Sequence, residues 1–307
     1  MIEVSHLTKA YGETLAVDDL SFTVQPGIVT GFLGPNGAGK STTMRMILGL
    51  DAPTSGSATV DGRDLARHAA PLTSIGFLLE AGAIHPNRSA HDHLRSLAVT
   101  NGISAARVDH VLDTVGLGAV AKRRSGGFSL GMGQRLGIAA ALLGDPEVVM
   151  LDEPVNGLDP EGIQWIRHLL QDLAREGRTV FVSSHLMSEM ELMAEHFVMI
   201  GRGRLIRDIS ALELREMASG ESTQVSADRL GDLVDLLAAD GVEVRSSERD
   251  LVTVVGLDAD HIGRVARDAG IALTRLVPDQ RSLEDVFMSL TADAVQYQGA
   301  DTTRTAA

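Results

Sequence analysis

The stretch Gly34-Pro35-Asn36-Gly37-Ala38-Gly39-Lys40-Ser41-Thr42 decides the fold of this chain. It has the pattern G-x-x-x-x-G-K-[ST], which is the phosphate-binding loop. An apolar run at residues 28–33 precedes the loop and predicts a strand. Residues 40–50 follow it and predict a helix, because their apolar side chains are spaced for one buried face. A strand, the loop and a helix in this order are the context that the motif requires.

The chemistry of the loop favours a nucleoside triphosphate. Glycines allow successive backbone N–H groups to face phosphate oxygens, and the start of a helix adds its positive dipole. Lys40 would place its ammonium group near the β- and γ-phosphates, and the hydroxyl of Ser41 would bind Mg²⁺. A glycine-rich turn without a ligand is the alternative, and the strand and helix on either side argue against it.

The composition limits the class of protein. The chain has 307 residues, enough for one large or two modest domains, and its net charge of −14 disfavours a nucleic-acid surface. It has no cysteine, which excludes a disulfide framework and fits a reducing compartment. We expect no signal peptide, because no basic and apolar leader opens the sequence. No window holds about 20 uncharged apolar residues, so we expect other chains to make any membrane crossing.

Functional groups follow four of the predicted strands. In chain order these groups are the phosphate loop, Glu80, the pair Asp152-Glu153, and His185. Strands that alternate with helices predict a mostly parallel sheet, and such sheets bind ligands at the carboxyl ends of their strands. We therefore expect all four groups to lie at one edge of one sheet.

The two adjacent carboxylates suit different tasks beside a phosphate loop. Asp152 would reach the Mg²⁺ bound by Ser41, and Glu153 is the natural general base for an attacking water molecule. A helix cap or a solvated turn is the alternative for such a pair.

The order of predicted elements divides the chain into two domains and a tail. Residues 1–218 predict an α/β core with a mainly helical subdomain inserted at about residues 87–143. Residues 219–291 predict a βαββαβ unit followed by a helix, which is a small ferredoxin-like α+β domain. Residues 292–307 are rich in Ala, Thr, Asp and Gln, and we expect a disordered tail there.

Several motifs, taken in order, resemble the ATP-binding subunit of ABC transporters over about residues 1–220. Residues 34–42 match the Walker A loop of that family, and residues 148–154 match its Walker B segment. Residues 156–160 look like the D-loop, and His185 matches the switch histidine. The resemblance implies a P-loop ABC ATPase core with a mixed sheet, binding ATP and Mg²⁺, in which His185 polarises the γ-phosphate.

Tyr11 has two interpretations. From its position alone, the ring either covers the edge of a sheet at a turn or stacks on a purine. The resemblance favours the second, because Tyr11 falls where the family stacks its adenine.

The chain departs from the family in its signature loop and in its Q-loop. Residues 128–135 read F-S-L-G-M-G-Q-R where the family has L-S-G-G-Q-x-Q-R. Ser129 and Gly131 still offer a hydroxyl and an N–H group at a helix start, which a γ-phosphate needs, so we expect this loop to function. Glu80 stands where the family usually has Gln. As a carboxylate it can accept hydrogen bonds from Mg²⁺-bound water, and we expect it in both the catalytic and the metal-binding sets.

The resemblance implies an ATP-hydrolysing subunit that powers a membrane exporter. Residues 282–291 look like the tail of drug, antibiotic and lipid exporter ATPases, whose permease is a separate polypeptide. The expected partners are that permease and a second copy of the chain or another paired ATPase subunit, without nucleic acid. Two copies would pack head to tail, with ATP between residues 34–42 of one and residues 129–131 of the other. The expected location is the cytoplasmic face of the cell membrane.

Two other classes compete with the exporter. The first is a soluble ABC ATPase of translation or DNA repair, which usually has two cassettes or a long coiled coil. The second is a P-loop kinase or GTPase, but the N-K-x-D motif that reads guanine does not occur in the sequence. The cargo, the direction of transport and the role of the C-terminal domain stay open at this point.

Overall fold

The computed structural model describes residues 1–68, 71–79, 84–218, 222–238, 242–248, 250–278 and 282–291. Two compact units make up the chain. One contains Met1–Ala211 with the end of the chain from Ser289, and the other is Leu212–Met288. The expected disordered tail, residues 292–307, lies outside the described residues.

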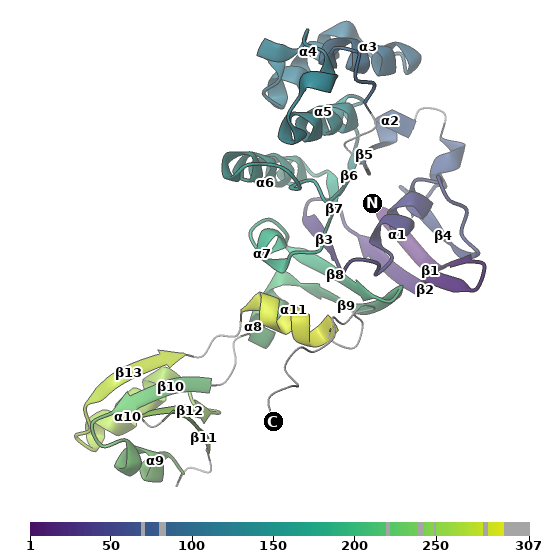
Figure 1. Ribbon diagram of the computed structural model, residues 1–307. Coiled ribbons are helices and arrows are strands. Elements are labelled where there is room, and N and C mark those ends of the chain that lie inside the picture. The colour runs from purple at the N-terminus through teal and green to yellow at the C-terminus, as the bar shows by residue number, and fades with distance from the viewer. Residues whose placement is uncertain are drawn as a thin grey trace, which may run out of the picture. The chain divides into compact units, whose positions relative to one another are not determined.

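Nine strands and seven helices are described within the first unit (Figure 1). The strands are β1 (Ile2–Tyr11), β2 (Thr14–Val24), β3 (Val29–Leu33), β4 (Ser55–Val60), β5 (Ile75–Leu78), β6 (Val148–Asp152), β7 (Thr179–Ser184), β8 (His196–Gly201) and β9 (Arg204–Ser210). The helices are α1 (Lys40–Ile47), α2 (Pro71–Ser74), α3 (Ala90–Thr100), α4 (Ala105–Thr114), α5 (Leu130–Leu142), α6 (Pro160–Arg175) and α7 (Met187–Met190).

These strands form two sheets. The larger has the order β5-β6-β7-β3-β8-β9, in which only β9 runs antiparallel to its neighbour. The smaller is antiparallel, with the order β2-β1-β4. The mostly parallel sheet expected from the alternation of strands and helices is therefore confirmed.

The core of this unit lies where α1 packs among the strands of both sheets. Met44 and Ile47 on α1 are fully buried there, as their spacing predicts. Three phenylalanines join the sheets, with the ring of Phe32 5.6 Å from that of Phe22 on β2 and 5.1 Å from that of Phe181 on β7. Their packing fixes the helix that follows the phosphate loop against the sheet that carries the other functional groups.

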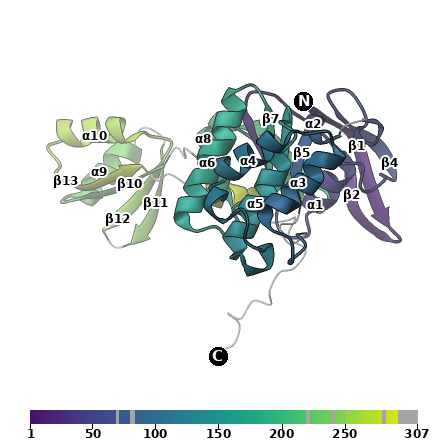
Figure 2. The same ribbon diagram turned by 90° about the horizontal axis from the view of Figure 1, so that it is seen from above.

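A mainly helical segment interrupts the α/β core, as the sequence predicts. Helices α3, α4 and α5 pack against one another; Figure 1 shows them together at the top of the first unit, and Figure 2 looks down on them. Both α3 and α5 begin at a capping serine. Ser89 accepts a hydrogen bond from the backbone N–H of Asp92, and Ser129 accepts one from that of Met132. These caps fix where each helix starts.

The register of the larger sheet aligns the carboxyl ends of its strands. Leu33 at the end of β3 pairs with Ser184 at the end of β7, and Asp152 at the end of β6 pairs with Ser183. The groups that follow these strands consequently meet at one edge, which is the arrangement expected from the sequence.

Two helices differ from what the sequence indicates. The spacing of the methionines at 187, 190 and 193 predicts a helix over residues 186–194, but α7 covers only Met187–Met190. Beyond it the chain tightens into turns, in which the N–H of Met193 bonds to the carbonyl of Met190 three residues back. The methionines at 187, 190 and 193 are nevertheless buried, as their spacing predicts. Helix α8 (Ala211–Ala218), which crosses from the first unit into the second, was not predicted.

The second unit has the predicted ferredoxin-like pattern. Its elements are β10 (Ser222–Ala227), α9 (Leu230–Ala238), β11 (Glu243–Glu248), β12 (Leu251–Val255), α10 (Ala259–Asp268), β13 (Leu273–Pro278) and the start of α11 (Leu283–Thr291). The sheet is antiparallel with the order β11-β12-β10-β13. Apolar side chains of α9 and α10 form one core with the inner residues of the sheet. Within the described part of the whole chain, no helix is long and apolar enough to cross a membrane.

Candidate active site

The conformation of the phosphate loop depends on glycine at two positions. Gly39 has φ +103°, and a Cβ at this position would lie 2.6 Å from the backbone oxygen of Ala16. A Cβ at Gly34 would lie 2.6 Å from the backbone oxygen of Ile200. Only glycine fits either position, so the loop holds the conformation in which its N–H groups can cradle a phosphate.

Lys40, the first residue of α1, is almost completely buried, with 7 % of its surface exposed. Its Nζ donates a hydrogen bond of 2.6 Å to the carbonyl of Gly34 and lies 3.8 Å from Oε1 of Glu153. Burial lowers the pKa of Lys40, and the charges of Glu153 and Asp152 oppose that effect. An anionic phosphate beside this ammonium group would stabilise its charged form.

A hollow of about 270 Å³ lies over the loop. Its lining is Ala16, residues 36–42 and Glu153, so the general base predicted from the sequence faces the loop directly. The hollow therefore brings together the phosphate-binding groups and a carboxylate from the neighbouring strand end.

Ser41 and Asp152 meet at the edge of this hollow. The hydroxyl of Ser41 donates a hydrogen bond of 2.7 Å to Oδ2 of Asp152, although 111 residues separate them in sequence. A hydroxyl and a carboxylate are oxygen ligands of the kind that Mg²⁺ takes, and Mg²⁺ usually binds few protein ligands beside substrate phosphates. This donor pair fits the expected metal ion.

Glu153 and His185 form the third contact of the site. Nδ1 of His185 lies 2.8 Å from Oε2 of Glu153, within hydrogen-bonding distance. The other carboxylate oxygen of Glu153, Oε1, lies 3.8 Å from Nζ of Lys40. The histidine therefore orients one carboxylate oxygen while the other faces the lysine of the phosphate loop.

Tyr11 lies at the end of β1 with its ring about half exposed, at 49 %. Its hydroxyl donates a hydrogen bond of 3.1 Å to Oδ2 of Asp51, and the hydroxyl of Thr42 also interacts with it. Nζ of Lys9 lies 4.9 Å from the centre of the ring. Burial raises the pKa of Tyr11, and Asp51 adds to the effect. The ring is thus anchored beside the phosphate loop, where either interpretation of Tyr11 is sterically possible.

Ser129 and Gly131 are not part of the hollow over the phosphate loop of their own chain. Ser129 begins α5 and lines a separate hollow with Pro86 and Phe128. A Cβ at Gly131 would lie 3.1 Å from the backbone oxygen of Gly157, so the signature loop adjoins the predicted D-loop. Within one chain these residues are separate from the other predicted site residues. Glu80 lies outside the described residues.

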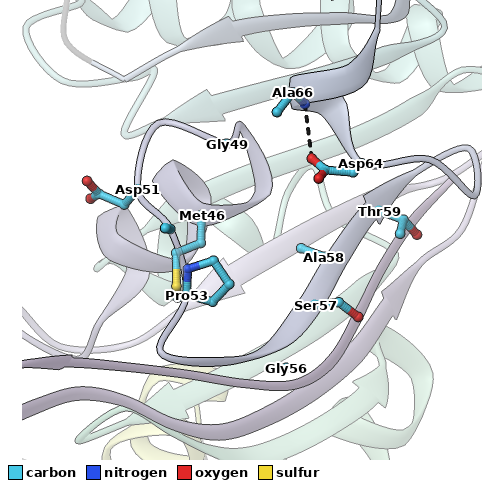
Figure 3. A pocket seen from close by; sticks show the side chains of 11 residues that line it. Met46, Gly49, Asp51, Pro53, Gly56, Ser57, Ala58, Thr59, Asp64 and Ala66 are labelled. Atoms are coloured by element: carbon cyan, nitrogen blue, oxygen red, sulfur yellow. Dashed lines mark hydrogen bonds between the residues drawn. The ribbon is translucent and has the colours of Figure 1, made fainter.

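A further hollow, of about 310 Å³, lies near the C-terminal end of α1 and is lined by the loop that follows this helix and by β4 (Figure 3). Asp51 stands at its rim, and Asp64 accepts a hydrogen bond from the N–H of Ala66. Arg45 holds the pKa of Asp51 below its ordinary value through a hydrogen bond of 2.8 Å. Asp51, which anchors Tyr11, is the one residue that this hollow shares with the described contacts of the site.

Sequence reasoning gave no role to two residues that touch the site, Ser183 and Gln134. Ser183 contacts both Asp152 and the backbone of Glu153, and Gln134 contacts the backbone at Glu153 and Pro154. The signal available for Ser183 was its place: it is a polar residue near the end of β7, the strand beside the one that ends at Asp152. No sequence signal indicated that Gln134 points at these carbonyl groups.

Comparisons with known protein families and with solved structures agree on the family to which the first unit is similar. A family model described as ABC transporter matches residues 17–156, and a model described as a domain of unknown function matches residues 221–284. A solved dimeric ATP-binding cassette in a post-hydrolysis state, bound to ADP and Pi, aligns with a TM-score of 0.63 at 25 % identity. That alignment covers 69 % of this chain and 99 % of the solved chain.

Two relatives have the same name. The bacitracin transport ATP-binding protein BcrA of Bacillus licheniformis is 45 % identical over 212 residues, which is 68 % of this chain and 69 % of that protein. BcrA of Enterococcus faecalis is 35 % identical over 302 residues, which is 94 % of this chain and 96 % of that protein. The second similarity extends through both units.

Proposed function

Because this chain belongs to the ATP-binding proteins of ABC transporters, we propose that it hydrolyses ATP to power a membrane exporter of antibiotic-like cargo. A relative similar over nearly its whole length is named a bacitracin transport ATP-binding protein, which favours transport over a role in translation or DNA repair. The hollow over the phosphate loop, with Glu153 in its wall, is the observation that carries the enzymatic part of the proposal.

In this proposal the phosphate loop holds the triphosphate. Backbone N–H groups of residues 34–42 would face the phosphate oxygens, and Lys40 would supply a fixed positive charge. Ser41 and Asp152, already 2.7 Å apart, would hold Mg²⁺. When bound, that ion supplies charge neutralisation at the phosphate oxygens. Tyr11 would stack on the adenine, with Asp51 fixing the position of its hydroxyl.

Glu153 would act as the general base. His185 holds Oε2, so Oε1 would take the proton from a water molecule as the water oxygen attacks the γ-phosphorus and ADP leaves. His185 would also polarise the γ-phosphate. Glu80, for which we propose the catalytic and metal-binding roles inferred from its sequence position, would assist beside the phosphates.

The complete site would need two copies of the chain. Ser129 and Gly131 do not line the hollow of their own chain, but a hydroxyl and an N–H at the start of α5 suit a γ-phosphate. A second copy, packed head to tail, would bring these groups to the ATP held by the first. The solved dimer of a similar cassette supports such a pairing.

The membrane-spanning part would come from a separately encoded permease. The chain would lie at the cytoplasmic face of the membrane, attached through that permease. Cargo would contact the permease, so the site described here does not select it.

A mixing experiment tests the shared site. Lys40→Ala removes the phosphate contact of one copy, and Ser129→Arg blocks the contribution of the other. Each variant alone should hydrolyse ATP at least about 100-fold more slowly than the wild type. An equimolar mixture should regain activity, because each mixed dimer contains one site with both an intact Lys40 and an intact Ser129. A mixture no more active than its parts would contradict the shared site, as would a Ser129→Arg variant with wild-type activity.

A further inference from the structure

The backbone of Glu153 is strained. Its φ is 49°, in the left-handed region that residues with a side chain rarely adopt. Such a conformation persists only where the surrounding structure holds it. The conformation turns the chain sharply after Asp152 and so sets where the Glu153 carboxylate lies.

Ser183 holds the N–H side of this residue. The hydroxyl oxygen of Ser183 accepts a hydrogen bond of 2.9 Å from the backbone N–H of Glu153 and donates one to Oδ1 of Asp152. Ser183 is fully buried on β7, directly opposite Asp152 in the register of the sheet. One hydroxyl therefore connects the carboxylate proposed for Mg²⁺ to the peptide of the proposed general base.

Gln134 holds the carbonyl side. Its Nε2 donates hydrogen bonds to the backbone oxygens of Pro154, at 2.9 Å, and Glu153, at 3.3 Å. Gln134 is 4 % exposed and belongs to α5, the helix that begins at Ser129. The strained residue is thus held from two elements, β7 and α5.

We infer that Ser183 is a positioning residue, which sets the carboxylate of Glu153 by holding its left-handed backbone and the side chain of Asp152 together. A hydroxyl suits this role because it can donate one hydrogen bond while accepting another. Alanine at this position would leave the N–H of Glu153 without this acceptor in a buried place, and the local backbone would relax. The inference rests on the proposed role of Glu153.

The adjacent serine provides a matched control. Ser184 is also fully buried on β7, but its hydroxyl donates to Oε2 of Glu189 and accepts from the N–H of Leu186. Ser184→Ala therefore removes one buried hydroxyl from the same strand without touching Asp152 or Glu153.

The test measures hydrolysis and nucleotide binding by the full chain. At saturating ATP and Mg²⁺, Ser183→Ala should lower kcat at least about 10-fold, since small displacements of a catalytic group have effects of this size. The Kd for a fluorescent ATP analogue should change less than about 3-fold, because the phosphate loop is intact. Ser184→Ala should keep at least half of the wild-type kcat. A kcat of Ser183→Ala within 2-fold of wild type would overturn the inference, as would an equal loss in both variants.

Two further variants make the result decisive. If Ser183→Ala does not fold, Ser183→Cys keeps the volume and a weaker hydrogen-bonding group. Its kcat should then be at least about 3-fold below wild type, and a wild-type kcat would overturn the inference. Glu153→Gln distinguishes an error in the role of Glu153 from an error in the role of Ser183. If that variant hydrolyses normally, the proposed role of Glu153 is wrong, and the inference about Ser183 is overturned with it. If it is inactive while Ser183→Ala is normal, only the role of Ser183 is wrong.

Discussion

Nδ1 of His185 lies 2.8 Å from Oε2 of Glu153, across the ends of two neighbouring parallel strands. The histidine fixes one carboxylate oxygen, and the other lies 3.8 Å from Nζ of Lys40. The proposed general base is therefore held between a residue of the next strand and the phosphate loop.

Glu153→Gln should bind ATP but lose hydrolysis. The amide oxygen can still accept a hydrogen bond from His185, whereas the amide cannot take a proton from water. We expect kcat to fall by about 10²- to 10⁴-fold, measured as phosphate release. Glu189→Gln is the control, because it neutralises a nearby carboxylate that contacts Ser184 and does not line the hollow. A Glu153→Gln variant with wild-type kcat would remove Glu153 from its role.

Ser41→Ala should lower the affinity for Mg²⁺ more than it lowers the affinity for ATP measured without metal. The variant removes the hydroxyl that lies 2.7 Å from Asp152 and leaves the backbone of the loop unchanged. The Mg²⁺ concentration for half-maximal hydrolysis should rise about 10- to 100-fold. Thr43→Ala is a matched control, because the Thr43 hydroxyl bonds to the carbonyl of Gly39 instead. An unchanged Mg²⁺ titration of Ser41→Ala would be incompatible with a magnesium site at this pair.

Tyr11→Ala and Tyr11→Phe together decide between the two interpretations of this residue. If the ring stacks on adenine, the alanine variant should raise the KM for ATP by roughly 5- to 100-fold, the range expected for one stacked base. The phenylalanine variant keeps the ring and loses only the contacts of the hydroxyl with Asp51 and Thr42, so its KM should stay within about 5-fold of wild type. If Tyr11 only covers the sheet edge, both variants should hydrolyse ATP normally, and Tyr11→Ala should merely unfold at a lower temperature.

Glu189 should make stability depend on pH. Burial raises the pKa of Glu189 above its ordinary 4.5, and the charge of Glu153 adds to this effect. The folded state therefore binds this proton more tightly than the unfolded state does. The resulting stabilisation is fully present below pH 4.5 and is lost as pH rises through the raised pKa. Glu189→Gln removes the ionisable group, so its Tm at pH 7 should exceed that of the wild type by roughly 1–3 °C.

The same comparison at lower pH supplies the control. The difference in Tm between Glu189→Gln and the wild type should shrink as the pH falls below 4.5, where the wild-type carboxyl is protonated in both the folded and the unfolded state. A difference that stays constant with pH would show that the effect of the substitution is steric and not due to ionisation.

The sequence was sufficient to predict the elements that carry local signals. The phosphate loop has a fixed spacing, and the apolar strands before it and before Asp152 end where polar residues begin. In a parallel sheet these ends must share an edge, so the meeting of Ser41 with Asp152 followed from topology alone. The ferredoxin-like order of the second unit was likewise readable from the alternation of strands and helices.

The contacts that the sequence did not reveal depend on tertiary register. Ser183 touches Asp152 and Glu153 only because the register of β6 and β7 places it opposite Asp152. Tyr11 and Asp51 are 40 residues apart, and no local pattern links them. The early end of α7 at Met190 reflects turns that bury Met193 and Ala194, where packing overrides the helical spacing.

The central claim, that two copies of the chain enclose the ATP, is tested most directly by sedimentation of Glu153→Gln with and without nucleotide. With Mg²⁺ and ATP this variant should sediment at twice the mass of the 32.5 kDa chain, and with ADP it should return to monomer. Adding Ser129→Arg to the same variant should abolish the ATP-dependent dimer. A chain that stays monomeric with ATP, even together with its membrane partner, would contradict the account.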